Sequence, residues 1–257
     1  MVSIQEVVIL AVVQGLTEWL PISSSGHLVI LQQLFGLQAS VAFDVMLHFG
    51  TLLAVVCFLW KDILEIVKGV LSLDFSREEA RMGAYIIIGS VPLAITGLLF
   101  KSFFESLFSN PTMVGIALFI NGIILYLTRF VILRKKIDSV DALTIGIAQA
   151  VSIIPGISRS GSTVSTAMLA GIDKKTAYKF SFLLSIIAII GASLIEFGEI
   201  NFAQEPIELI LAGVIISAIV GYIALKTVAK LVITGDFHKF AYYCWVLGII
   251  IVLLSIA

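Results

Sequence analysis

Six long apolar runs limit most strongly what this chain can fold into. A helix that crosses the hydrocarbon core of a bilayer needs about 20 mainly apolar residues. Six segments meet this requirement, at roughly 41–60, 82–101, 112–133, 177–197, 208–229 and 240–257. Only 13% of the 257 residues are charged, whereas about 25% is usual in soluble domains. We therefore predict an all-α polytopic membrane protein with six transmembrane helices, integrated as one domain over residues 1–257. A soluble enzyme, a disordered chain and a nucleic-acid binder are excluded.

Two further apolar regions are interrupted. Residues 4–36 contain Pro21-Ile-Ser-Ser-Ser-Gly-His27, and residues 141–170 contain Pro155-Gly-Ile-Ser-Arg-Ser-Gly-Ser162. The arms that follow these breaks would rise only about 20 Å and about 16 Å as helices, which is too short for a hydrocarbon core of about 30 Å. We therefore predict that each region is a re-entrant helix–loop–helix hairpin.

The two interrupted regions match each other. At an offset of 135 residues, identical residues coincide in four pairs: Gln14 with Gln149, Ser23 with Ser158, Ser25 with Ser160, and Gly26 with Gly161. The order of one hairpin and three spans also occurs twice, in a first repeat of about 1–133 and a second of about 141–257. Three crossings per repeat is an odd number, so we predict an inverted-topology duplication.

Positive charge is distributed unevenly between the two ends of the predicted spans. All but two of the 16 lysines and arginines fall on one side; Lys101 falls on the other, and Arg159 in a hairpin tip. Because cytoplasmic segments carry the excess of Lys and Arg, we predict that both termini lie outside and that the hairpins enter from opposite faces. On the cytoplasmic side, residues 61–75 mix charged and apolar residues at helical spacing, which predicts an amphipathic helix at the membrane interface.

The polar residues of the first break are typical of a ligand site. Gln14 and Glu18 are four residues apart and share a helix face. An ionisable group inside the membrane indicates function, although Glu18 could also extend to the headgroups. Residues 23–27 begin the second arm, and the start of a helix exposes N–H groups that suit an anion. Serines are also common helix caps, which is a purely structural alternative for one of them.

The second break repeats this design and adds Arg159. An arginine far from the membrane surface needs an anionic partner, and its forked guanidinium matches phosphate oxygens. The structural alternative is an internal ion pair between Arg159 and Glu18. The combined set suits a diphosphate on a membrane-embedded molecule, with these expected binding residues: Gln14, Ser23, Ser25, Gly26, Ser158, Ser160, Gly161 and Thr163.

Several roles stay open on the residues alone. His27 can accept or donate a proton, Ser24 or Ser25 can attack phosphorus or hold it, and Glu18 can act as a base or bind a divalent cation. Asp44 and His48 are four residues apart, which fits either a structural pair or a role in the site. For Asn121 we predict an interhelical hydrogen bond.

The two motifs resemble those of the undecaprenyl-diphosphate phosphatase family associated with bacitracin resistance. Residues Gln14-Gly-Leu-Thr-Glu18-Trp-Leu-Pro-Ile-Ser-Ser-Ser-Gly-His27 follow its (E/Q)xxxE pattern, and Pro155-Gly-Ile-Ser-Arg-Ser-Gly-Ser-Thr163 its PGxSRSxxT pattern. The resemblance covers essentially the whole chain. It implies removal of the terminal phosphate of undecaprenyl diphosphate, which recycles the lipid carrier of cell-wall synthesis in the bacterial plasma (inner) membrane.

The resemblance also implies site residues and a cofactor. It implies a divalent cation, Mg²⁺ or Ca²⁺, for which Glu18 is the candidate ligand, and a catalytic core of Glu18, Ser24, His27 and Arg159. The nucleophile is left open between Ser24, His27 and water. The expected partners are the polyprenyl diphosphate and membrane lipids, and a homo-oligomer is left open. The alternative function is a polyprenyl-phosphate flippase without hydrolysis, since inverted repeats with broken helices are common in transporters. An ion channel is disfavoured by Arg159.

Overall fold

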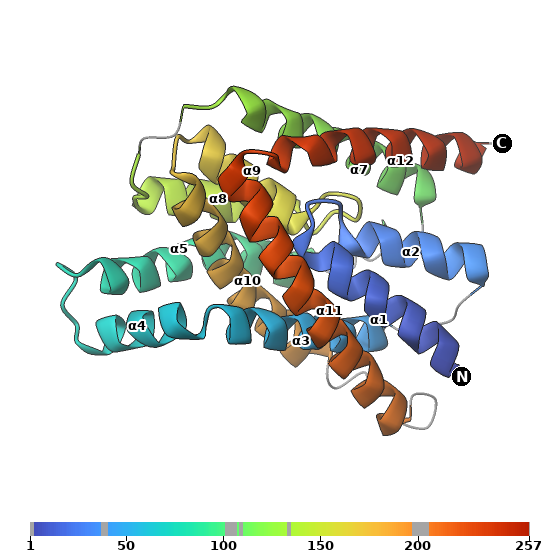
Figure 1. Ribbon diagram of the computed structural model, residues 1–257, viewed down its shortest axis with the longest axis horizontal. Coiled ribbons are helices and arrows are strands. Elements are labelled where there is room, and N and C mark those ends of the chain that lie inside the picture. Colours follow the sequence, from blue (N-terminus) through green and yellow to red (C-terminus); the bar gives the residue numbers. More distant parts are fainter. Residues whose placement is uncertain are drawn as a thin grey trace.

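The computed structural model describes residues 3–36, 41–100, 107, 110–132, 135–196 and 206–256, and within them it contains eleven α-helices and two short 3₁₀ helices. No β-strand occurs among these residues, so the predicted all-α class is confirmed (Figure 1). In chain order the α-helices are α1 (Ile4–Trp19), α2 (Ser24–Phe35), α3 (Val41–Phe58), α4 (Trp60–Leu71), α5 (Glu78–Leu99), α7 (Pro111–Leu127), α8 (Ser139–Val151), α9 (Arg159–Leu169), α10 (Lys174–Glu196), α11 (Ile207–Thr234) and α12 (Phe240–Ile256). The 3₁₀ helices are η1 (Thr128–Phe130) and η3 (Phe237–Lys239). Residue 107 is also helical.

Five of these helices are long and apolar enough to cross a membrane: α5, α7 with η1, α10, α11, and α12 with η3. Helices α3 and α4 pass the same test together, although the chain bends by 78° between them. The described residues therefore contain five candidate spans, or six if the bent pair is one span, as in a multi-pass membrane protein. The outer surface fits this environment, because large apolar side chains such as Leu98, Leu194 and Ile219 are exposed.

The predicted amphipathic helix at 61–75 is shorter than expected. Helix α4 ends at Leu71, and Leu73 adopts a left-handed φ of 54°, which turns the chain back toward α5. Helix α4 packs closely on α5 at Gly69, where a Cβ would lie 2.8 Å from the backbone nitrogen of Ala80. The predicted amphipathic helix is thus confirmed over Trp60–Leu71, whereas residues 72–75 lie outside it. Its place at the membrane interface stays a prediction.

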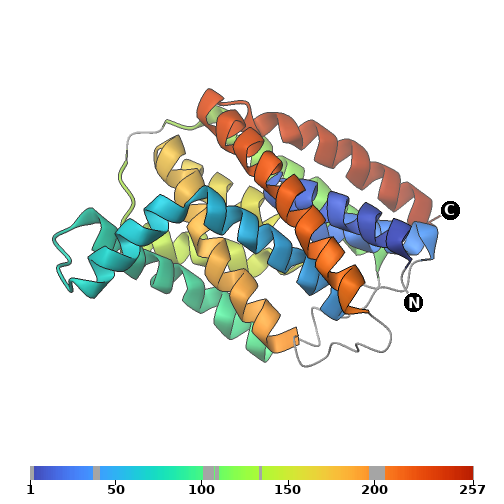
Figure 2. The ribbon, with the colours of Figure 1, turned by 60° about the horizontal axis from the view of Figure 1, so that its bottom comes forward.

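Helix packing brings each hairpin against a span from the other half of the chain. Helix α1 packs along α11, and α8 packs along α5. The second crossing is very close, since a Cβ on Gly146 of α8 would lie 2.3 Å from the carbonyl oxygen of Gly89 on α5. Small residues allow such approaches in membrane proteins, where van der Waals packing and hydrogen bonds hold helices together. Helices α7 and α12 also pack side by side (Figure 2).

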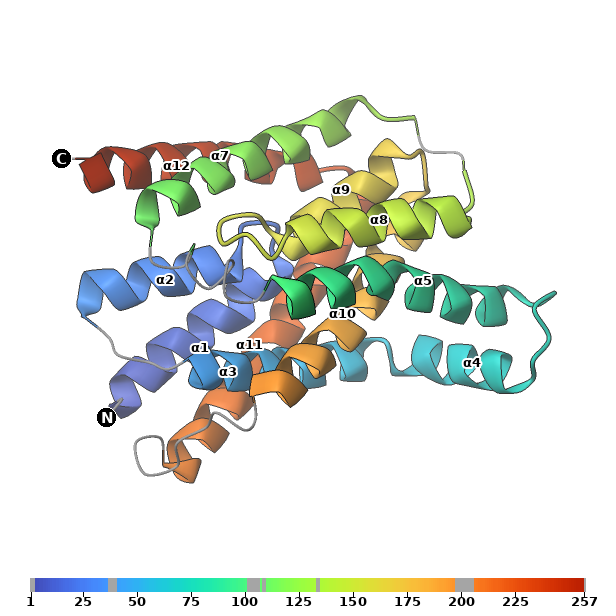
Figure 3. The same ribbon diagram turned by 180° about the vertical axis from the view of Figure 1, so that it is seen from behind.

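The two hairpins meet at their turns. The turn between α1 and α2 and the turn between α8 and α9 lie together near the middle of the molecule, and the two hairpins extend from there in opposite directions (Figures 1 and 3). The Ser23 hydroxyl oxygen accepts hydrogen bonds from the backbone N–H of Gly26, at 3.2 Å, and of Gly156, at 3.1 Å. One serine thereby joins the two turns.

Backbone geometry at these turns is unusual. Ser23 has a left-handed φ of 69°, a conformation that is uncommon for residues other than glycine. Gly156 has a φ of 101°, and a Cβ there would lie 2.4 Å from the carbonyl oxygen of Val114. Glycine is therefore required at position 156 both by its φ and by its close approach to α7.

Asn121 on α7 completes the junction. Its side-chain Nδ2 donates to the carbonyl of Pro21 at 2.8 Å, and its Oδ1 accepts from the backbone N–H of Ser158 at 3.2 Å. Nδ2 also donates to Cys244 Sγ on α12 at 3.4 Å, so the predicted interhelical hydrogen bond of Asn121 is confirmed, and the side chain contacts both turns. This arrangement places the end of α1 beside the start of α9.

Candidate active site

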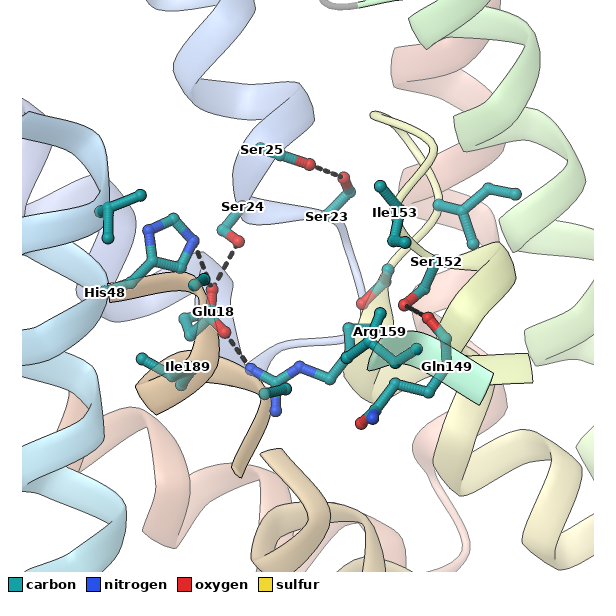
Figure 4. Close-up of a pocket in the computed structure, with 16 residues that line it drawn as sticks. Glu18, Ser23, Ser24, Ser25, His48, Gln149, Ser152, Ile153, Arg159 and Ile189 are labelled. Carbon is teal, nitrogen blue, oxygen red and sulfur yellow. Dashed lines mark hydrogen bonds and ion pairs between the residues drawn. The ribbon is translucent and has the colours of Figure 1, made fainter. Parts of the chain in front are cut away.

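A cavity of about 280 Å³ lies where the two turns meet α3, α5 and α10 (Figure 4). Both turns contribute polar side chains to it. The flanking helices contribute His48 and apolar side chains such as Val45, Leu93 and Ile189. Its lining residues are Glu18, Ser23, Ser24, Ser25, Val45, His48, Leu93, Gln149, Ser152, Ile153, Ile157, Ser158, Arg159, Ala188, Ile189 and Ala192. A polar interior with apolar walls suits a charged headgroup attached to a lipid.

The centre of the cavity is an ion pair between the two halves of the chain. Glu18 lies in the last turn of α1 and Arg159 is the first residue of α9. Arg159 Nη2 donates to Glu18 Oε1, and the exposed fractions of the two side chains are 15% and 5%. The ion pair considered as a structural alternative is therefore formed, and it places both charged residues at one site. The Arg159 guanidinium also lies 5.4 Å from the centre of the Trp19 ring.

The second oxygen of Glu18 accepts hydrogen bonds from two predicted site residues. Ser24 Oγ donates to Oε2 at 2.6 Å, and Gln14 Nε2 donates to the same oxygen at 3.0 Å. Gln14 is fully buried behind Glu18 and does not line the cavity. The carboxylate is thus oriented with a serine hydroxyl directly in front of it, which is the geometry expected for a base and the group that it deprotonates.

His48 also contacts Glu18. Its Nε2 lies 3.3 Å from Glu18 Oε2, and its Nδ1 lies 2.8 Å from the carbonyl oxygen of Asp44. The Asp44 carboxylate accepts from Gln32 Nε2, at 3.0 and 2.8 Å. His48 therefore contacts Asp44 through the Asp44 backbone carbonyl. The sequence left open whether this pair is structural or belongs to the site, and the structure places the His48 imidazole at the site.

His27 lies outside this cavity. Its Nδ1 is 2.7 Å from the carbonyl oxygen of Ser23, and its Nε2 is 2.7 Å from the hydroxyl oxygen of Tyr243 on α12. The ring stacks on Tyr243 and lines a different cavity, of about 580 Å³, between α1, α2, α11 and α12. The two hydrogen bonds turn His27 away from Glu18 and Arg159.

The other predicted binding residues divide into two groups. Ser23, Ser25 and Ser158 line the cavity, whereas Gly26, Ser160, Gly161 and Thr163 do not. Ser160 Oγ donates to the carbonyl of Leu20 at 3.3 Å, and Thr163 Oγ1 donates to the carbonyl of Arg159 at 2.8 Å. These hydroxyls hold the backbone of the two turns.

Gln149 and Ser152 line the cavity but were not among the predicted site residues. The 135-residue offset that aligns Gln149 with Gln14 was the available signal for Gln149. No comparable pattern in the sequence indicated Ser152, whose hydroxyl donates to the carbonyl of Gln149 at 2.6 Å.

The donor set for a divalent cation is small. Within the described ranges, no group of three or more His, Cys, Asp or Glu side chains could hold a metal ion. Glu18 supplies one carboxylate to the cavity. Mg²⁺ is commonly held by one or two carboxylates together with substrate phosphates and water. The residues therefore fit a cation that arrives with a phosphorylated substrate.

Comparisons with known proteins show the family to which this chain belongs. The family model of the bacitracin resistance protein BacA matches residues 7–250. A protein from Methanosphaera stadtmanae named undecaprenyl-diphosphatase is 40% identical, over 100% of this chain and 99% of its own length. Proteins of the same name from Halothermothrix orenii and Korarchaeum cryptofilum are 40% and 41% identical, each over 98% of its own length. This chain belongs to the bacitracin resistance protein BacA family.

Proposed function

We propose that this chain hydrolyses undecaprenyl diphosphate to undecaprenyl phosphate and orthophosphate. The observation that carries the proposal is the Glu18–Arg159 pair at the junction of the two turns, with the Ser24 hydroxyl on the same carboxylate. Apolar walls beside this polar centre suit a headgroup whose polyprenyl tail stays in the bilayer. The names of the relatives support the same reaction.

The roles of the central residues follow from their contacts. Arg159 forms one hydrogen bond to Glu18 and has a second guanidinium nitrogen without a partner among the described residues, so its fork is suited to phosphate oxygens. Glu18 is placed to accept a proton from the Ser24 hydroxyl or from water in the same position. If water attacks, its oxygen ends on the released orthophosphate. If Ser24 attacks, the terminal phosphoryl group is first transferred to Oγ, and water then hydrolyses the phosphoserine to orthophosphate. In both cases the bridging oxygen leaves with the lipid monophosphate.

We assign His48 to proton transfer through Glu18. A carbonyl oxygen only accepts, so the contact with Asp44 requires the proton on Nδ1. In a neutral ring, Nε2 would then direct a lone pair at the Glu18 carboxylate. The contact between His48 Nε2 and Glu18 Oε2 is favourable when a proton lies between these two atoms. This proton is available to the lipid monophosphate as it leaves.

Charge balance supports a divalent cation at the site. The positive charge of Arg159 is already paired with Glu18, whereas a diphosphate brings at least two negative charges. Glu18 and the substrate phosphates would hold Mg²⁺ or Ca²⁺ together, and the cation would offset the charge of the phosphates.

Phosphate release in detergent tests the function. Purified protein supplied with undecaprenyl diphosphate and Mg²⁺ is expected to release orthophosphate, to stop when EDTA is added, and to recover with excess Mg²⁺ or Ca²⁺. Detergent removes the two compartments between which a flippase would act. Absence of phosphate release from folded protein under all these conditions would contradict hydrolysis and favour the flippase, and release that is insensitive to EDTA would contradict the cation.

For the membrane arrangement we propose two re-entrant hairpins in an inverted repeat. Helices α1 and α8 both begin with a capping box, formed by Ser3 and Glu6 in α1 and by Asp138 and Asp141 in α8. These residues are again 135 apart. The 135-residue spacing thus extends beyond the pairs seen in the sequence and supports two copies of one folding unit.

The second arms of the hairpins support the same proposal. Ser23 and Ser158 each accept a hydrogen bond from the backbone N–H of the glycine three residues later, at 3.2 and 3.1 Å. Gly36 after α2 and Gly171 after α9 both have a positive φ, of 62° and 87°. In the proposed repeat, α1 corresponds to α8 and α5 corresponds to α11. The packing of α1 on α11 is therefore matched by the packing of α8 on α5, as a two-fold axis in the membrane plane requires.

Both termini are then expected to face the outside of a bacterial plasma membrane. The test is labelling by a membrane-impermeant maleimide in intact cells, after Cys57, which is exposed, and Cys244, which is buried, have been replaced by alanine. A cysteine introduced at Ser3 or Ser255 should be labelled, and one at Lys68 or Lys230 should not. Labelling with the opposite pattern would contradict the orientation.

A further inference from the structure

Gln149 is an unsatisfied amide inside the active-site cavity. Its side chain is fully buried, and neither Oε1 nor Nε2 has a hydrogen-bond partner among the residues that the structure describes. A buried amide without a partner destabilises a fold relative to an apolar side chain of the same shape. Gln149 nevertheless lines the cavity, where a ligand could supply the missing partner.

The repeat explains why Gln149 lacks a protein partner. Its counterpart Gln14 donates to Glu18 at 3.0 Å. Four residues after Gln149 stands Ile153, whose side chain offers no acceptor. The second hairpin thus carries the same amide without the carboxylate that accepts from the Gln14 Nε2 in the first. The two hairpins supply different groups to one site: a carboxylate and a serine from the first, and an arginine and an amide from the second.

Other unsatisfied buried polar atoms do not share this location. Among the described residues with such atoms, only Gln149 and Arg159 line the active-site cavity; Gln14, Trp19, Ser162, Ser165, Ser193 and Trp245 do not. In Arg159 the unpartnered atom is Nη1. Gln149 and Arg159 come from α8 and α9, on the same side of the cavity and opposite Ser24 and His48 (Figure 4).

We propose that Gln149 is a substrate-binding residue whose amide, together with Arg159 Nη1, binds oxygens of the diphosphate. Nε2 donates to a non-bridging phosphate oxygen, and Oε1 accepts from a water or a protonated phosphate oxygen. A neutral amide adds donors without adding charge, so the site does not become more basic. This proposal rests on the proposed function, since it names a ligand contact for the same reaction.

The test compares Gln149→Met with Ser165→Ala. Methionine keeps the length of the side chain and removes both polar atoms. Ser165 is the matched control because its hydroxyl is also buried and unpartnered among the described residues but lies outside the cavity. Thermal unfolding in detergent is measured with and without inorganic diphosphate and Mg²⁺, and kcat and KM are measured with undecaprenyl diphosphate.

Loss of one hydrogen bond to a charged group predicts a fall in kcat/KM of about tenfold to a hundredfold for Gln149→Met. Its melting temperature without ligand should equal or exceed that of the wild type, and its stabilisation by inorganic diphosphate should decrease. Ser165→Ala should keep wild-type values of all three. Product inhibition identifies the phosphate: weaker inhibition by orthophosphate indicates the terminal phosphate, and weaker inhibition by undecaprenyl phosphate indicates the phosphate next to the lipid.

Two results would overturn the proposal. One is a wild-type kcat/KM in Gln149→Met. The other is a lower melting temperature with unchanged stabilisation by diphosphate, which would make Gln149 a structural residue. The stabilisation assay does not need turnover. A wild type that binds diphosphate but releases no phosphate would contradict the proposed function, and the effect of Gln149→Met on diphosphate binding could still be determined.

Discussion

Replacing Arg159 with lysine is expected to lower kcat/KM by about 1000-fold, in the range found when charge-stabilising donors are removed from phosphoryl-transfer sites. Lysine keeps the positive charge but lacks the guanidinium fork. In Arg159, one nitrogen of this fork donates to Glu18, and the other has no partner among the described residues and is available to phosphate. The measurement is steady-state phosphate release from undecaprenyl diphosphate in detergent, on protein whose melting temperature has been checked.

Arg129 provides the matched control. It lies in η1, is exposed, and contacts the hydroxyl of Tyr126 at 3.3 Å, outside the cavity. Arg129→Lys should therefore keep the wild-type rate. A fully active Arg159→Lys would remove Arg159 from phosphate binding and leave only its ion pair with Glu18.

The second large effect is expected from His48→Gln, with a decrease in kcat of about 100-fold, which is typical for loss of a general acid or base. Glutamine can still extend an N–H toward Glu18 but cannot carry a proton between Glu18 and the leaving phosphate. The contact that it replaces is the 3.3 Å approach of His48 Nε2 to Glu18 Oε2. Rates of the variant are measured under saturating substrate, so that weaker binding does not mask the effect on kcat.

The other two histidines make the comparison specific. His238 also has its Nδ1 near a backbone carbonyl, at 3.0 Å from Gly235, but it does not line the active-site cavity. His238→Gln should leave kcat unchanged. If His27→Gln abolished turnover while His48→Gln stayed fully active, proton transfer would belong to His27, as the family resemblance implies, and our assignment of His48 would be wrong.

Much of the architecture was readable from the sequence because apolar length is a direct physical requirement for crossing a bilayer. The segments at 82–101, 112–133, 177–197, 208–229 and 240–257 overlap α5, α7, α10, α11 and α12. The segment at 41–60 overlaps α3, which passes the test for a span together with α4 across a bend of 78°. Apolar length alone did not indicate this bend.

The centre of the site was also readable, for a different reason. A glutamate and an arginine are costly inside the membrane unless each has a partner, so Glu18 and Arg159 were the obvious candidates although they are 141 residues apart. Their contact follows from the meeting of the two turns through Ser23, Gly156 and Asn121.

Side-chain direction was not readable. His27 and Ser24 are three residues apart on α2, yet Ser24 donates to Glu18 whereas His27 binds Tyr243 on α12. That partner is 216 residues away in the chain, and local spacing carries no information about it. Likewise, the spacing of Asp44 and His48 suggested a pair, but the imidazole reaches Glu18 on a different helix.

A structure with a non-hydrolysable methylene analogue of undecaprenyl diphosphate bound would test the central claim most directly. We expect its phosphonate oxygens to lie between the two turns, within hydrogen-bond distance of Arg159 and of the Ser24 hydroxyl. An analogue bound instead in the cavity beside His27 and Tyr243, with the contact between Glu18 and Arg159 unchanged, would contradict the account.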